Sequence, residues 1–164
     1  MGGQACVLYG AAQFSKDVDF LILADEKNYV GLLDALKELE AVRIAVPKFD
    51  TDVLERGHAV HFRCQAPGVV GLRIDLMTRL RSMEDFPVLW ARRTAIVGDD
   101  GGEINLLAIP DLVDAKKTQR EKDWPVISAL VEEHYHSLGM EPNSNYRCLV
   151  NGFQFHSNAN RPYR

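Results

Sequence analysis

Hydrophobic and polar positions follow two different periods along the first 137 residues of the chain. Between residues 26 and 39 the apolar side chains recur at steps of three and four, which is the spacing of one face of an amphipathic helix. The same spacing predicts a final helix, with its stripe formed by Trp124, Ile127, Val131 and Tyr135. Shorter helices are expected at residues 5–9, at residues 50–56 with Asp50 or Thr51 as the cap, and at residues 110–118.

Apolar runs rich in β-branched and aromatic residues predict strands between these helices. An Ala-Pro-Gly turn at residues 66–68 separates two of them, and the Gly- and Asp-rich segment 98–102 separates the last two as in a hairpin. The expected strands cover residues 17–24, 58–64, 72–78, 94–97 and 103–107. This mixture predicts an α/β or α+β fold with a small mixed sheet flanked by helices.

Length and composition limit the chain to one ordinary domain. With 164 residues, 46% of them hydrophobic and 26% charged, it can build one core, and disorder or a coiled coil is not expected. No apolar run approaches the about 20 residues that span a bilayer, so no membrane partner is expected, and no secretory signal is visible. We expect residues 1–137 to form the domain and residues 138–164, which are polar and rich in Asn, to form an irregular tail.

Charge and cysteine content narrow the class of protein further. The net charge of −4 does not favour nucleic-acid binding by bulk electrostatics, although a local basic patch can still serve. Cys6, Cys64 and Cys148 are far apart and form no CxxC pair, which favours reduced thiols in a cytoplasmic protein.

The candidate chemistry starts with two carboxylates near the beginning of the chain. Asp17 and Asp19 are two positions apart on an expected strand, so both point to one face, about 6 to 7 Å apart along the chain. A third acid, Asp75, lies between apolar residues on another expected strand. If the two strands are neighbours, three carboxylates converge, and Mg²⁺ or Mn²⁺ is the natural compensation for burying them.

A glycine pair near the N-terminus supplies a complementary feature. Gly2 and Gly3 precede the first expected helix, where glycine lets backbone N–H groups approach an anion without a Cβ in the way. A triphosphate would fit there while the acids hold its metal ions.

These elements together resemble the nucleotidyltransferase superfamily of the polymerase-beta type. The resemblance rests on Gly2-Gly3, thirteen intervening residues, Asp17-Val18-Asp19-Phe20 and the later Asp75. The sequence around Phe14-Ser15-Lys16 and in the basic segment 116–124 is similar to that of bacterial nucleotidyltransferases related to the toxin components of abortive-infection systems. The resemblance covers residues 2 to about 135. Two departures are that Met1 directly precedes the glycine pair and that the common Ser after the first glycine is absent.

The resemblance implies roles for each of these residues. Asp17, Asp19 and Asp75 would be the catalytic carboxylates and metal ligands. The nucleotide would be bound by Gly2, Gly3, Ser15, Lys16, Lys117 and Arg120. Against this, a segment such as Lys116, Lys117, Arg120 and Lys122, with acids among the basic residues, is more often a solvated helix face than a nucleotide clamp. Ser15 and Lys16 could instead cap the strand.

The function expected from this reading is metal-dependent transfer of a nucleoside monophosphate from a nucleoside triphosphate to a hydroxyl acceptor, which could be an RNA, a protein or a small molecule. An alternative is a catalytically inactive nucleotide-binding or toxin–antitoxin-type interaction domain with the same fold and an antitoxin protein as partner. A third is a structural metal site in an unrelated protein.

The remaining histidines and tryptophans are expected to have structural roles: His58 and His61 point to opposite faces of a strand, and Trp90 and Trp124 anchor the core.

Overall fold

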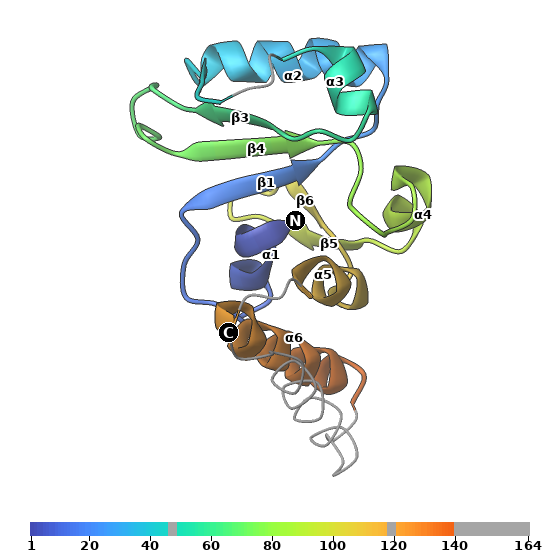
Figure 1. Ribbon diagram of the computed structural model, residues 1–164. Helices are drawn as coiled ribbons and strands as arrows, with labels where there is room; N and C mark the ends of the chain where they lie inside the picture. The colour runs from blue at the N-terminus through green and yellow to red at the C-terminus, as the bar shows by residue number, and fades with distance from the viewer. Residues whose placement is uncertain (46–48, 118–120, 140–164) are drawn as a thin grey trace, which may run out of the picture.

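The computed structural model describes residues 1–45, 49–117 and 121–139. In this part of the chain a four-stranded sheet lies between two groups of helices, and a two-stranded sheet packs below it (Figure 1). The fold is therefore a mixed α and β arrangement, as the sequence predicts. The irregular tail expected at residues 138–164 falls outside the described residues from position 140 on.

The larger sheet has the strand order β1-β4-β3-β2. Its strands are β1 (Asp17–Leu21), β4 (Arg73–Met77), β3 (Val60–Arg63) and β2 (Val42–Arg43). β1 and β4 run parallel, whereas β4 with β3 and β3 with β2 run antiparallel. The parallel pair brings together two segments that are more than fifty residues apart in sequence, with β1 at the edge of the sheet.

Two helices cover one face of this sheet. α2 (Glu26–Glu38) starts at Asp25, whose side chain accepts a hydrogen bond from the backbone N–H of Asn28, and α3 (Thr51–Glu55) starts at Asp50 in the same manner. In Figure 1 they lie above β3 and β4. The strands turn every second residue toward these helices, and this gives one apolar cluster: Tyr29, Leu36, Leu54, Val60, Phe62, Cys64, Ile74 and Leu76.

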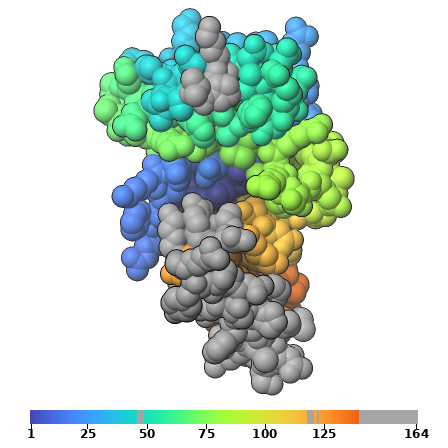
Figure 2. Space-filling view, in the orientation of Figure 1, coloured from blue at the N-terminus to red at the C-terminus, as the bar shows by residue number. Residues whose placement is uncertain are grey.

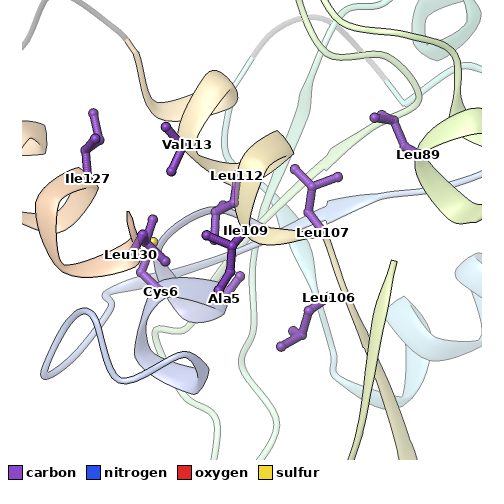
Figure 3. Packing of buried hydrophobic residues seen from close by; sticks show 10 residues of the cluster. All are labelled: Ala5, Cys6, Leu89, Leu106, Leu107, Ile109, Leu112, Val113, Ile127 and Leu130. Atoms are coloured by element: carbon purple, nitrogen blue, oxygen red, sulfur yellow. The ribbon is translucent and has the colours of Figure 1, made fainter. Parts of the chain in front are cut away.

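The second group of helices forms a separate core below β1. It contains α1 (Gly2–Leu8), α4 (Phe86–Ala91), α5 (Ile109–Lys116) and α6 (Trp124–Ser137), together with the hairpin strands β5 (Thr94–Val97) and β6 (Glu103–Leu106). A short 3₁₀ turn, η1 (Glu121–Asp123), leads into α6. Figure 3 shows how these elements meet in one apolar cluster: Ala5, Cys6, Leu89, Leu106, Leu107, Ile109, Leu112, Val113, Ile127 and Leu130.

An ion pair joins two helices of this lower group. Asp111 on α5 is 5% exposed, and its two carboxylate oxygens accept hydrogen bonds from Nε and NH2 of Arg92, each at 2.6 Å. Arg92, which follows α4, also contacts Glu84 at 2.7 Å. These bonds raise the pKa of Arg92 and fix the end of α4 against α5.

Most elements expected from the sequence are present, with ends that differ by a few residues. Two strands are shorter than expected: β1 ends at Leu21, and β3 begins at Val60. His58 therefore lies outside β3, so its predicted place on a strand is wrong. The first helix begins at Gly2, so the glycine pair forms its first turn and does not precede it.

Besides the 3₁₀ turn η1, one helix and one strand were not expected from the sequence. The helix α4 has only six residues and lacks room for a repeated apolar stripe, and β2 has two residues. Trp90 on α4 is 42% exposed, which contradicts its predicted role as a core anchor. Its ring stacks on Phe86 and lies 4.0 Å from the guanidinium carbon of Arg93, so it is held at the surface by aromatic and cation–π contacts.

Among the described residues no helix has the length and apolar character needed to cross a membrane.

Candidate active site

The strand pairing places the three predicted carboxylates on one face of the larger sheet. Asp19 on β1 is the register partner of Asp75 on β4, so their Cα atoms are about 4.8 Å apart. Asp17 lies two residues before Asp19 and therefore points to the same side. This face is opposite the apolar one that packs on α2 and α3, and it looks toward α1 (Figure 1). The expectation that the two strands are neighbours is confirmed.

Asp75 is held by two basic neighbours. Its Oδ1 accepts a hydrogen bond from Nε of Arg73 at 2.7 Å, and its Oδ2 accepts one from NH2 of Arg73 at 3.0 Å. His61 on β3, the register partner of Asp75, has Nδ1 2.8 Å from the same Oδ1. Hydrogen bonds and the nearby carboxylate raise the pKa of Arg73, so this guanidinium stays charged. Asp75, only 7% exposed, is therefore paired with a cation.

Asp17 is oriented by a residue just before the strand. The hydroxyl of Ser15 donates to Oδ1 of Asp17, 3.1 Å away, or to the backbone carbonyl of Asp17 at 2.9 Å. Ser15 therefore fixes the carboxylate at the entrance to β1. This contact gives Ser15 a positioning role, and its contact with a nucleotide stays a prediction.

The glycine pair lies directly against the acids. A Cβ on Gly2 would be 1.8 Å from Oδ2 of Asp19, and a Cβ on Gly3 would be 2.2 Å from Oγ of Ser15. Gly2 also has a φ of +64°, which side-chain-bearing residues rarely adopt. Glycine is thus required here to let α1 approach β1. In Figure 2 these earliest residues, in dark blue, lie in a recess between the sheet and the light-green α4.

Asp19 is the carboxylate with the most unfavourable surroundings. Burial raises its pKa first, and the negative charges of Asp17 and Asp75 raise it further. A hydrogen bond from the backbone of Gly3 acts in the opposite direction. A cation placed between the three acids would relieve this repulsion, as the sequence predicts.

The donor chemistry of the three acids fits a hard divalent cation. Carboxylate oxygens are the ligands that Mg²⁺ prefers, and Oδ2 of Asp75 keeps a second lone pair beside its bond to Arg73, whereas Oδ1 is contacted by both Arg73 and His61. Even so, among residues 1–45, 49–117 and 121–139 no three His, Cys, Asp or Glu side chains already form a metal-holding group. Binding by Asp17, Asp19 and Asp75 together therefore requires side-chain rotation.

Lys116 and Lys117, two of the predicted basic residues, have partners at the end of α5 and in the lower core. Lys117 pairs with Asp114 at 2.7 Å at the end of α5, and Lys116 is close to Cys6 in the lower core. Lys16 is exposed beside Asp17. Arg120 lies outside the described residues. A nucleotide-binding role for Lys16, Lys117 and Arg120 stays a prediction.

Sequence reasoning missed the two residues that contact Asp75. Arg73 is two positions before Asp75 on the same expected strand, so strand alternation alone places it on the carboxylate face. That signal was available from the sequence. His61 was harder to find, because its contact depends on the antiparallel register of β3 against β4.

Asp111 is a useful comparison for Asp75, because an arginine holds both oxygens of each. Arg92, the arginine that holds Asp111, has one further acidic partner, Glu84, which lies at the surface. Asp75 instead shares its cation with Asp17 and Asp19, whose charges also act on Arg73. Three carboxylates and two cations, Arg73 and the N-terminal ammonium of Met1, thus meet at the face around Asp75, whereas two carboxylates share Arg92.

Two grooves at the carboxyl end of β1 lie next to this face. Both are lined by Leu21, Phe86 and Trp90, and the larger one extends to Asp25 and Lys27 on the side of α2. Neither is lined by Asp17, Asp19 or Asp75.

The sequence matches no protein-family model and no curated protein. The resemblance to nucleotidyltransferases therefore rests on the residues named above.

Proposed function

We propose that this protein is a metal-dependent nucleotidyltransferase. The proposal rests above all on the register of β1 and β4, which sets Asp19 beside Asp75 and leaves Asp17 on the same face. Three carboxylates face one guanidinium and the N-terminal ammonium of Met1, which leaves one negative charge in excess, and excess negative charge favours divalent cations.

In this proposal Asp17, Asp19 and Asp75 hold Mg²⁺ or Mn²⁺, and Gly2 and Gly3 lie beside the triphosphate. When bound, the metal ions would offset the negative charge that develops on the transferred phosphoryl group. Ser15 keeps Asp17 pointing at the site, and Arg73 with His61 keeps Asp75 in place. The acceptor hydroxyl oxygen bonds to the α-phosphorus, the bond to the bridging oxygen of pyrophosphate breaks, and the hydroxyl proton passes to Asp75.

A direct assay tests the proposal. The chain is incubated with each of labelled ATP, CTP, GTP and UTP and with Mg²⁺ or Mn²⁺, in the presence of RNA, protein and small hydroxyl acceptors. Pyrophosphate release and label transfer are measured. We expect Asp19→Asn to reduce the signal at least about 100-fold while the melting curve stays cooperative. Asp34→Asn, which changes an exposed acid on α2, is the matched control. Equal activity of the Asp19→Asn variant would contradict the proposed metal-dependent mechanism.

A second candidate is an inactive nucleotide-binding or interaction domain with the same fold, with an antitoxin protein as a possible partner. The observation that favours it is the double hydrogen bond from Arg73 to Asp75, because a guanidinium there supplies positive charge without any metal ion. This candidate predicts triphosphate binding without pyrophosphate release. Calorimetric titration with a non-hydrolysable triphosphate, run with and without Mg²⁺, separates it from the enzyme, which requires the metal ion for tight binding.

A further inference from the structure

A row of basic side chains continues the polar face of the sheet beyond the aspartates. Arg63 on β3 is the register partner of Arg73 on β4, and His61 is the partner of Asp75. Register partners on neighbouring strands share a face, so these basic residues lie on the face of the acids. From β1 to β3 the face thus changes from acidic to basic within about 10 Å, the width of two strand spacings.

Arg63 is the member of this row whose charge is available to a ligand. It is exposed and forms no ion pair with any residue in the described part of the chain. Arg73 directs Nε and NH2 to Asp75, and His61 presents Nδ1 to the same carboxylate. The basic row therefore has one free guanidinium at its outer end and two groups anchored to Asp75 at its inner end.

We infer that this row binds backbone phosphates of the acceptor, and that the acceptor is a nucleic-acid strand with a terminal hydroxyl. The inference rests on the proposed function, which places the triphosphate beside Gly2 and Gly3. In an in-line displacement the attacking hydroxyl and the leaving pyrophosphate lie on opposite sides of the transferred phosphorus. The glycines border β1, so the acceptor approaches over β4 and β3, where the arginines are.

The chemistry of the row selects this class of acceptor. Arg63 and Arg73 form a cross-strand pair with Cα atoms about 4.5 to 5.5 Å apart. Asp75 holds the guanidinium of Arg73, so Arg63 is the member of the pair that can take an added anion. A guanidinium binds phosphate through paired N–H donors, so a phosphate of a nucleic-acid strand suits Arg63. A neutral small molecule with a hydroxyl group would offer no negative charge for Arg63 to bind. Because the net charge of the chain is −4, this attraction has to be local.

Binding of fluorescein-labelled 12-nucleotide single-stranded RNA and DNA to the full chain, followed by anisotropy at several salt concentrations, tests the inference. We expect Arg63→Gln to weaken binding about 3- to 10-fold and to lower the salt slope by about 1. Arg43→Gln is the matched control. Arg43 is also exposed and lies one strand away, but its register partner Phe62 places it on the opposite face. We expect the control to bind like the wild type.

Binding of labelled nucleoside triphosphate with Mg²⁺, measured on the same variants, keeps this inference distinct from the proposed function. Arg63→Gln should leave triphosphate binding unchanged, whereas Asp19→Asn should abolish it. The inference is wrong if neither oligonucleotide binds, if Arg63→Gln and Arg43→Gln behave alike, or if Arg63→Gln weakens the triphosphate and not the oligonucleotide. Oligonucleotide binding that depends on Arg63, with no triphosphate binding, would instead overturn the proposed function alone.

Discussion

The two faces of the larger sheet are built from the same strands and have opposite character. On β4, Ile74 and Leu76 turn toward α2 and α3, whereas Asp75 between them turns toward α1. All three are buried, with Asp75 at 7% and Ile74 at 5% exposure. The faces thus differ little in burial at this strand. They differ in the condition under which burial is stable. Apolar side chains need only close packing, whereas buried carboxylates need neighbouring positive charge and hydrogen-bond donors.

The largest expected effect separates the two faces by stability. Leu76→Ala removes a side chain that is 1% exposed in the upper cluster and should lower the free energy of unfolding by about 2–5 kcal/mol. Arg63→Ala on the polar face should change it by no more than about 0.5 kcal/mol. Urea unfolding monitored by tryptophan fluorescence and circular dichroism measures both. Similar losses at the two positions would contradict the assignment of one face to folding and the other to binding.

Gly2 tests how closely α1 must approach the polar face. Gly2→Ala places a Cβ against the carboxylate of Asp19 in addition to straining a φ of +64°. Gly10→Ala is the control, because Gly10 has a similar φ of +75° and nothing within 4 Å of the added Cβ. We expect Gly2→Ala to be less stable than Gly10→Ala by about 1–3 kcal/mol, from overpacking alone. Equal values would mean that α1 moves away without cost.

Substitution of Arg73 tests whether its guanidinium supplies the positive charge that a metal ion would otherwise supply on the polar face. Arg73→Gln removes the cation that is bonded to Asp75 and interacts with Asp17 and Asp19, so the melting temperature at pH 7 should fall. Millimolar Mg²⁺ should then raise the melting temperature of this variant more than that of the wild type. Arg43→Gln, on the other face, should show neither effect. A variant that melts lower and does not respond to Mg²⁺ would favour the inactive domain.

The sequence predicted the apolar face better than the polar one for a physical reason. Periodicity reports local geometry, so α2, α6 and the strand alternation around Asp75 follow from it directly. Strand alternation also brings Asp17 and Asp19 to one side. The contact of His61 with Asp75 depends on the antiparallel register of β3, which is set by tertiary packing. The close approach of Gly2 to Asp19 likewise depends on how α1 docks on β1, and periodicity carries no information about docking.

The smallest expected effect is a gain in stability at the site itself. Burial and the charges of Asp17 and Asp75 raise the pKa of Asp19 in the folded protein above its unfolded value of 3.8. The folded state therefore binds the proton more tightly, and the charged carboxylate lowers stability at every pH above its folded pKa. Asp19→Asn should be more stable than the wild type at pH 7, and this advantage should shrink as the pH falls through the folded pKa and disappear below 3.8.

Urea midpoints for wild type, Asp19→Asn and the exposed control Asp34→Asn, measured from pH 7 to pH 3, decide this. An advantage of Asp19→Asn that is constant with pH, or that grows in acid, would show that repulsion among the carboxylates is not its cause. If the advantage has the expected pH dependence and the same variant loses nucleotide transfer, then the charge that destabilises the polar face is the charge that the chemistry uses. On the apolar face stability and activity do not conflict, because close packing of its side chains does not reduce activity.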